Sequence, residues 1–92
     1  FYYGANAALY VFDLTRAYTL NNLKRWDDEV RKNAPSLRNK VLVGNKVDLK
    51  KMIEVDDSEA IAVKEEIGAK DYIKTSAKTG ENVKTAFERL LE

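Results

Sequence analysis

Short apolar runs alternate along this chain with longer segments in which apolar residues recur every three or four positions. The runs at 8–12, 40–44 and 71–75 have the length and composition of strands, and the third alternates charged with apolar residues. Continuous apolar runs are typical of strands that are buried on both faces of a sheet. The pattern therefore predicts three strands, of which the third has one less buried face.

The segment after the first strand predicts an amphipathic helix. Thr19 is placed to cap its amino end, and Asn33 with the following Pro35 ends it. The spacing of three and four residues gives one apolar face. That face is expected to consist of Leu20, Leu23, Trp26 and Val30.

Two further helices are predicted, one after each of the other strands. In the second helix Asp56 and Glu59 have the spacing of a capping box, and Gly68 suits a left-handed helix stop. Its inner face is expected to consist of Ala60, Val63 and Ile67. Asn82 is placed to cap the third helix, whose inner face is expected to consist of Val83, Phe87 and Leu90.

The predicted order is βαβαβα, and this order implies an α/β fold. Strands that alternate with helices form a parallel sheet with right-handed crossovers. Two polar motifs, at 45–48 and 76–78, each follow a predicted strand directly. Ligands of open α/β sheets bind at the carboxyl ends of the strands. Both motifs are therefore expected at the ligand-binding edge.

The chemistry of the first motif, Asn45-Lys46-Val47-Asp48, suits a guanine base. Guanine offers two adjacent donors, N1–H and the 2-amino group, and a carboxylate such as that of Asp48 can accept both. Adenine has an acceptor at N1 and no amino group at C2, so it would leave the carboxylate unpaired. Sites of this kind discriminate strongly against the wrong base.

The other motif residues have expected roles around the same base. The Lys46 stem would lie along one face of the base, and the Asn45 amide would tie the two loops together and reach N7. In the second loop, Ser76 would orient the carboxylate, the Ala77 N–H would donate to O6, and Lys78 would cover the other face. The six expected site residues are Asn45, Lys46, Asp48, Ser76, Ala77 and Lys78.

Each motif alone has a simpler interpretation. An N-K-x-D segment is a common surface turn, and a serine before a helix is usually a helix cap. Their joint occurrence, each after a buried strand and with a helix between them, is much more specific. We therefore interpret them together as parts of a guanine-nucleotide site.

The composition excludes several classes of function. The 92 residues fit one domain and contain neither cysteine nor histidine, so disulfides, thiol nucleophiles, Cys/His zinc sites and histidine general bases are excluded. The net charge is +1 with no basic stripe, which argues against nucleic acid as a partner. The longest apolar run, at 7–12, is too short to span a bilayer. No catalytic or metal-binding residues are predicted.

The chain resembles the C-terminal half of a Ras-superfamily small GTPase, most closely the Rab branch. The resemblance covers essentially all 92 residues. It is carried by Tyr2-Tyr3-Gly4-Ala5, the run from Ala8 to Thr15, Trp26, Val43 to Leu49, and Thr75 to Val83. It implies that Asn45, Lys46 and Asp48 form the family's base-specificity motif. Ser76, Ala77 and Lys78 then correspond to its last nucleotide-contacting loop.

The resemblance also implies a partial P-loop-NTPase-like fold in which residues 1–92 are the base-recognition portion and the N-terminal half of the G domain is missing. Family members are cytosolic or membrane-peripheral switches that bind GDP and GTP with magnesium, hydrolyse GTP and engage protein regulators and effectors. The chain contains no G-x-x-x-x-G-K-[ST] phosphate loop, no magnesium ligands and no C-terminal cysteine for a lipid anchor. We expect a fragment that binds guanine nucleotide weakly and hydrolyses none.

Three further expectations follow. The strand from Ala8 to Phe12 would present an unpaired apolar edge, which favours self-association. An alternative function is a non-catalytic protein-interaction scaffold, with contact aromatics Tyr2, Tyr3, Tyr18 and Trp26. An ATP-binding α/β domain is a third possibility, and Asp48 argues against it.

Overall fold

The computed structural model describes residues 2–3 and 7–91. Its elements are β1 (Tyr2–Tyr3), β2 (Ala7–Asp13), α1 (Ala17–Asn33), β3 (Asn39–Asn45), the 3₁₀ helix η1 (Lys50–Met52), α2 (Asp57–Ile67), β4 (Asp71–Lys74) and α3 (Val83–Leu90). The Gly4-Ala5 part of the resemblance lies outside the described residues. So do the side chains of Tyr2 and Tyr3, which were expected to offer contact aromatics. No helix in the described part of the chain is long and apolar enough to cross a membrane.

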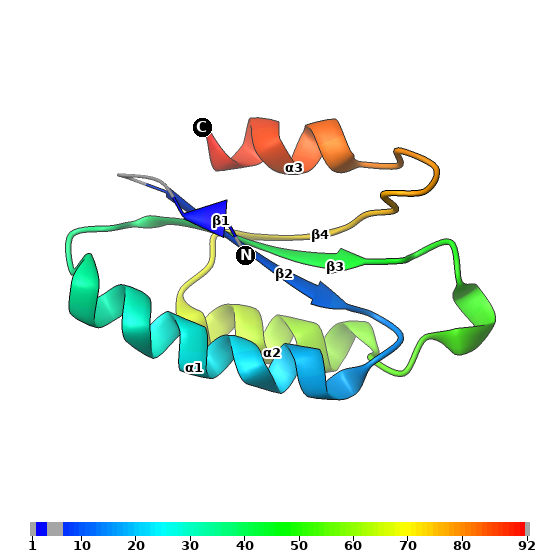
Figure 1. The fold of residues 1–92 in the computed structure, drawn as a ribbon, viewed down its shortest axis with the longest axis horizontal. Helices are drawn as coiled ribbons and strands as arrows, with labels where there is room; N and C mark the ends of the chain where they lie inside the picture. Colours follow the sequence, from blue (N-terminus) through cyan, green and yellow to red (C-terminus); the bar gives the residue numbers. More distant parts are fainter. Residues whose placement is uncertain (1, 4–6, 92) are drawn as a thin grey trace.

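The sheet has the order β1-β2-β3-β4, and β2, β3 and β4 are parallel as predicted (Figure 1). The register pairs Asp13, the last residue of β2, with Asn45, the last residue of β3. The α/β fold with three parallel strands and three helices is confirmed. Strand β1 was not predicted, because two residues are too few to show a periodic pattern.

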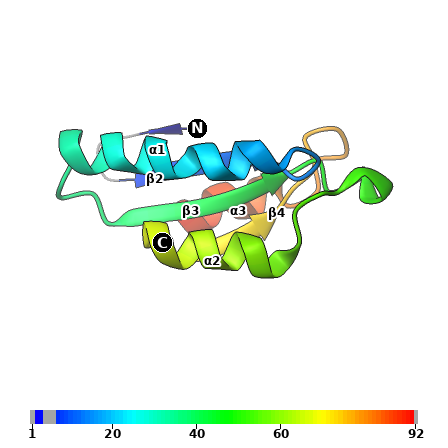
Figure 2. The same ribbon diagram turned by 90° about the horizontal axis from the view of Figure 1, so that it is seen from below.

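The helices cover both faces of the sheet. Helices α1 and α2 lie on one face, where they flank β3 when the molecule is seen from below, and α3 lies on the other face (Figures 1 and 2). Alternate residues of β2 and β3 enter the two cores. Tyr10 and Leu42 belong to the core beneath α1 and α2, whereas Leu9 and Val43 belong to the core beneath α3.

The edge of β2 is less open than its sequence indicates. Strand β1 pairs with it antiparallel, so that Tyr2 lies opposite Leu9 and Tyr3 opposite Ala8. From Ala8 to Phe12 the side chains are buried, apart from a half-buried Val11. The expectation of an unpaired apolar edge is therefore wrong for the first half of the strand, because β1 satisfies its backbone groups.

The inner face of α1 differs from the predicted one at a single position. Trp26 is 47% exposed, and the neighbouring Asp27 is buried, with an exposed fraction of 3%. Position 27 continues the three- and four-residue spacing of Leu20, Leu23 and Val30, which are buried as predicted. An aspartate is tolerated there because the Tyr10 hydroxyl donates to it at 2.9 Å and the Lys40 ammonium at 2.8 Å.

Helix α1 also begins earlier than predicted. Arg16 is the residue before the first turn and makes no side-chain cap, while the Ala17 N–H donates to the Glu54 carboxylate at 3.0 Å. Thr19 lies inside the first turn. Its hydroxyl accepts from the Asp13 N–H at 2.9 Å, so it ties the helix to the end of β2 rather than capping it.

The ends of α2 follow the sequence, whereas those of α3 differ in part. The capping box of Asp56 and Glu59 is present, and Gly68 has the left-handed conformation, with φ of 75°. Asn82 precedes α3 with φ of 59°, but its side chain donates to the Lys74 carbonyl rather than capping the helix. On the inner face of α3 Leu90 is buried as predicted and Val83 is half-buried, but Phe87 is 47% exposed and Ala86 is buried in its place.

Candidate functional site

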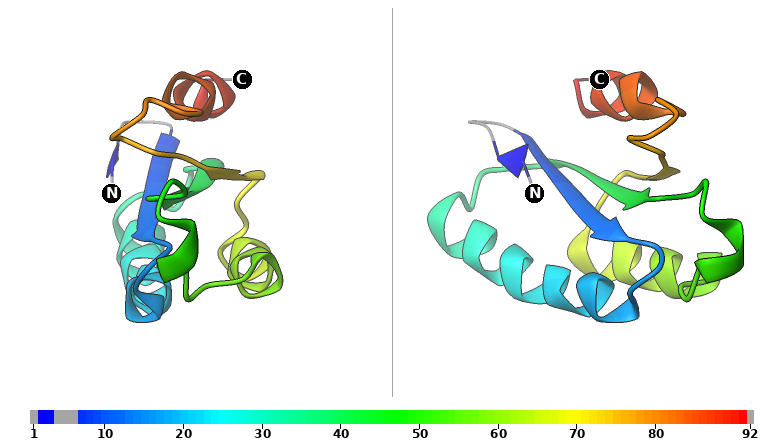
Figure 3. Two further views of the ribbon diagram at one scale, coloured as in Figure 1. Left: turned by 90° about the vertical axis from the view of Figure 1, so that its right-hand side faces the viewer. Right: turned by 45° about the vertical axis from the view of Figure 1, so that its right-hand side comes forward.

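The two polar motifs meet at the carboxyl end of the sheet. Two backbone hydrogen bonds join their loops: the Thr75 N–H donates to the Gly44 carbonyl at 2.8 Å, and the Val47 N–H donates to the Thr75 carbonyl at 3.0 Å. Figure 1 shows both loops leaving the same end of the sheet, and the left panel of Figure 3 views the molecule from that end. The parallel register thus places the candidate site where the topology predicts it.

Asp48 is oriented by the second loop. The Ser76 hydroxyl donates to its Oδ1 at 2.7 Å, and the same hydroxyl oxygen accepts from the Thr79 N–H at 3.1 Å. Ser76 is fully buried, so its hydroxyl has few other orientations available. The carboxylate of Asp48 is only half-buried and retains acceptor capacity for a ligand.

Asn45 joins the two loops through its side chain. Its Oδ1 accepts from the Ala77 N–H at 3.2 Å and lies 3.4 Å from the Thr75 hydroxyl oxygen. The Ala77 N–H, expected to donate to O6 of guanine, is therefore already bonded within the protein. A base oxygen at this position would have to share that donor with Asn45 or take it over.

Lys46 has an unusual backbone and a defined side-chain partner. Its φ is 70°, in the left-handed region that residues other than glycine rarely adopt. Its ammonium lies 2.8 Å from Oδ2 of Asp13, and its side chain is 44% exposed. Strained backbone of this kind is concentrated at functional sites.

Asp13, at the end of β2, was not among the predicted site residues. Burial alone would raise the pKa of its carboxyl group, but the hydrogen bonds from Lys46 and Thr15 outweigh burial, so that the pKa lies below its usual value. Thr15 donates to Oδ1 through both its N–H, at 2.9 Å, and its hydroxyl, at 2.7 Å. The carboxylate is therefore ionised and fixed in direction at neutral pH.

The six predicted residues are thus brought together unequally. Asn45, Ala77, Asp48 and Ser76 are linked across the two loops, as described above, while Lys78 is exposed on the outer part of the second loop. A shallow hollow of about 190 Å³ beside α3 is lined by Asn45, Ala77 and mostly apolar residues. Sequence reasoning missed Asp13 because its partner, Lys46, lies 33 positions away on a different loop.

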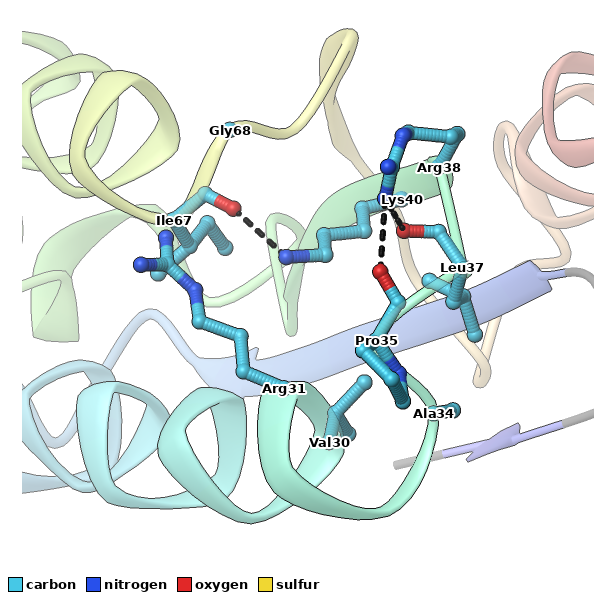
Figure 4. Close-up of a pocket in the computed structure, with 9 residues that line it drawn as sticks. All are labelled: Val30, Arg31, Ala34, Pro35, Leu37, Arg38, Lys40, Ile67 and Gly68. Atoms are coloured by element: carbon cyan, nitrogen blue, oxygen red, sulfur yellow. Dashed lines mark hydrogen bonds between the residues drawn. The ribbon is translucent and has the colours of Figure 1, made fainter.

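A second pocket lies at the opposite end of the sheet, where β3 begins, and has a volume of about 440 Å³ (Figure 4). Its cationic groups are all engaged within the protein. Lys40 donates to the Ile67 carbonyl at 3.0 Å and to Asp27, Arg38 donates to two carbonyls of its own loop, and Arg31 pairs with Asp27 at 2.8 Å. We therefore assign this pocket a structural rather than a ligand-binding role.

Metal binding is a separate question, because nucleotide sites of this kind commonly include magnesium. Within residues 2–3 and 7–91, no group of three or more acidic, histidine or cysteine side chains is arranged to hold a metal ion. The polar groups that meet at this edge suit a guanine base, since they combine an oriented carboxylate, an amide and a backbone N–H.

Comparisons with known proteins identify the family of the chain. The chain belongs to the Ras family, whose family description matches residues 1–92. It is similar to "GTP-binding protein YPTM1" of Zea mays, with 41% identity over 95% of this chain and 41% of that protein. It is also similar to "Ras-related protein RABA5e" of Arabidopsis thaliana, with 41% identity over 99% of this chain and 41% of that protein.

A third relative is "Ras-related protein YPTC6" of Chlamydomonas reinhardtii, with 42% identity over 99% of this chain and 42% of that protein. The chain therefore spans about two-fifths of the length of the curated relatives it matches. Rab-named relatives match it, which is consistent with the resemblance to the Rab branch noted in the sequence.

Proposed function

We propose that this chain binds guanine nucleotides as the base-recognition part of a Rab-like small GTPase switch. The observation that carries the proposal is the half-buried Asp48 carboxylate, which the buried Ser76 hydroxyl orients at 2.7 Å. A carboxylate fixed in this way can accept from N1–H and the 2-amino group of guanine together. Adenine would leave it without donors, and this difference supports specificity for guanine.

The neighbouring residues would complete the contacts with the base. The Lys46 stem would cover one face and Lys78 the other, while the Asn45 amide would reach N7 and the Ala77 N–H would donate to O6. Base contacts of this kind are worth about 4–5 kcal/mol, which corresponds to a dissociation constant on the order of a millimolar. We therefore expect weak binding by the chain alone and no hydrolysis of GTP, because hydrolysis depends on groups around the phosphates.

The activities of the whole protein belong to the same proposal. A Rab-like switch would bind GTP and GDP with magnesium, hydrolyse GTP, and engage regulators and effectors in the cytoplasm or at the surface of a membrane. Signalling and vesicle traffic are the processes in which such switches act. The names of the relatives, which include "GTP-binding protein" and "Ras-related protein", support this proposal.

An amide-resolved NMR titration tests base recognition directly. We expect GMP and GDP to shift the amide signals of Asn45, Asp48 and Ala77, with saturation near millimolar concentration, and AMP to shift none of them. Asp48→Asn should weaken GMP binding and admit XMP, because the asparagine amide can donate to the 2-oxo group of xanthine. Asp28→Asn on the exposed side of α1 is a matched control and should bind GMP as the original chain does.

A second candidate function is a protein-interaction scaffold. It is supported by two exposed aromatic side chains on α1, Tyr18 and Trp26, with exposed fractions of 58% and 47%. The titration separates the two proposals, since a folded chain whose amide signals respond to none of the nucleotides would favour the scaffold. The coding sequence upstream of Phe1 gives an independent test, because a phosphate-loop motif there would support the switch.

Self-association is a subsidiary proposal. Among the described residues, β1 pairs with Ala8 and Leu9 of β2, so a second copy could add a strand along the rest of β2. Sedimentation equilibrium of the chain at increasing concentration tests this. A constant monomer mass at the concentrations used for the titration would rule it out.

A further inference from the structure

We propose that Asp13 is a positioning residue of the base site: it holds the ammonium of Lys46 so that the Lys46 stem lies ready over one face of the base. The inference rests on the proposed function, and it adds a third loop to the site. Neither motif contains Asp13, which lies at the end of β2.

The end of β2 brings Asp13 close to Lys46. Asp13 lies opposite Asn45 in the β2–β3 register, and the Leu14 N–H donates to the Asn45 carbonyl at 3.0 Å. The end of β2 is therefore attached to the residue that immediately precedes Lys46. From this place the carboxylate of Asp13 reaches the Lys46 ammonium at 2.8 Å.

The two carboxylate oxygens of Asp13 have different partners. Oδ1 accepts both hydrogen bonds from Thr15 and so fixes the turn that leads into α1. Oδ2 faces Lys46, with the Arg16 guanidinium more distant at 3.8 Å and largely exposed. A role limited to the turn would need only Oδ1, so the direction of Oδ2 points to Lys46.

Without this partner, the Lys46 side chain would be mobile. Its side chain is 44% exposed and has four rotatable carbon–carbon bonds, so an unpaired ammonium would sample many conformations in water. Binding a base would then require the stem to be ordered. With Asp13 present, that ordering occurs before the nucleotide arrives, and the affinity increases accordingly.

The test compares Asp13→Asn with Asp56→Asn. Asparagine keeps the oxygen that accepts from Thr15 but replaces Oδ2 by an amide nitrogen, which cannot accept from Lys46. Asp56→Asn makes the same chemical change at the exposed cap of α2, where asparagine is an equally good cap. We expect GMP to bind about threefold more weakly to Asp13→Asn, as for loss of one partly exposed ion pair, and with unchanged affinity to Asp56→Asn.

A double-mutant cycle shows whether Asp13 acts through Lys46. In a Lys46→Met background, Asp13→Asn should have no further effect on GMP affinity. A purely structural role for Asp13 would weaken binding in both backgrounds and would overturn the proposal. Equal GMP affinities of Asp13→Asn and the original chain would also overturn it, while leaving guanine binding intact.

NMR relaxation of the Lys46 side-chain methylenes gives a readout that needs no nucleotide. These groups should be ordered in the original chain and in Asp56→Asn, and mobile in Asp13→Asn. Equal order in all three would overturn the proposal. If the original chain binds no GMP, the proposed function fails for this chain, and the relaxation data still decide whether Asp13 positions Lys46.

Discussion

Two tyrosines on the same side of the sheet, the buried Tyr10 and the half-buried Tyr72, differ in how their hydroxyl groups are satisfied. The Tyr10 hydroxyl donates to Asp27 at 2.9 Å. The Tyr72 hydroxyl is also buried, but it has no hydrogen-bond partner within the described residues. The ring of Tyr72 stacks on Phe12, with 6.1 Å between ring centroids. The ring therefore contributes packing, whereas its hydroxyl contributes no hydrogen bond within the described residues.

This difference predicts opposite outcomes for the same substitution. Tyr72→Phe removes an unsatisfied polar group and should leave the free energy of unfolding unchanged or raise it by up to about 1 kcal/mol. Tyr10→Phe removes a donor from the buried Asp27 and should lower it by about 1–3 kcal/mol. Urea denaturation of both variants measures the two values, and a larger loss for Tyr72→Phe would contradict the structure.

The same tyrosines predict a loss of stability in alkali. Burial, followed by the charge of Asp57, raises the pKa of Tyr72 to about 12, and burial together with Asp27 raises that of Tyr10. Tyrosines of the unfolded chain ionise near pH 10, so the stabilisation is complete below about pH 10 and is lost as the pH rises towards 12. Melting temperatures measured from pH 8 to 12 should fall above pH 10, and less steeply in Tyr72→Phe.

At the scale of elements, α2 has the most complete cap. Oδ1 of Asp56 accepts from the Glu59 N–H at 2.9 Å and from the Ser58 hydroxyl at 2.6 Å. Asp56→Ala should therefore lower the free energy of unfolding by about 1 kcal/mol. Ser58→Ala leaves the cap in place and should change stability by less than about 0.5 kcal/mol. Thermal unfolding of both variants by circular dichroism tests this, and equal losses would argue that the cap contributes nothing specific.

The elements also show which features of the fold can be predicted from sequence. The three parallel strands and the capping box follow from local pattern, and the structure confirms them. The prediction that Trp26 is buried was wrong, because Asp27 occupies that side of the helix and is satisfied by Tyr10 and Lys40, which are distant in sequence. Strand β1 could not be predicted for a similar reason, because it is defined by its pairing with β2.

The candidate site, too, could be predicted only in part from the sequence. Its two motifs are visible in the sequence because each is a short segment that follows a strand. Asp13 is not, because its role depends on a register that places it beside Asn45 and on the direction in which Lys46 extends. Long-range partners of this kind leave no local signal.

At the scale of the whole molecule, a buried charged cluster joins two strands of the sheet to the two helices beneath it. Asp27 of α1 accepts from Lys40 of β3 and Tyr10 of β2, and Lys40 also donates to the last carbonyl of α2, that of Ile67. Four elements therefore meet at one pair of opposite charges. Both groups are more than nine-tenths buried, so Lys40 depends on Asp27 for its charge partner, while Asp27 also pairs with Arg31 at 2.8 Å.

Removing one charge of this pair should be costly. Lys40→Met leaves Asp27 with Arg31 as its cationic partner and should lower the free energy of unfolding by about 1–3 kcal/mol. The double variant Asp27→Leu/Lys40→Met leaves no uncompensated charge in the core and should recover much of that loss. Chemical denaturation of the single and double variants tests this, and additive losses would contradict the coupling.

Strand β3 carries Lys40 of this cluster near its start and Asn45 of the candidate site at its end. Lys40 and Asn45 are five residues apart along an extended strand, or about 17 Å. At the effective dielectric constant of about 20 that suits buried sites, two unit charges so far apart interact by about 1 kcal/mol, and salt screens buried charges little. Lys40 and Asp27 carry opposite charges 2.8 Å apart, so their fields largely cancel at this distance, and replacing both together by neutral residues should leave the charges of the proposed base site nearly unaffected.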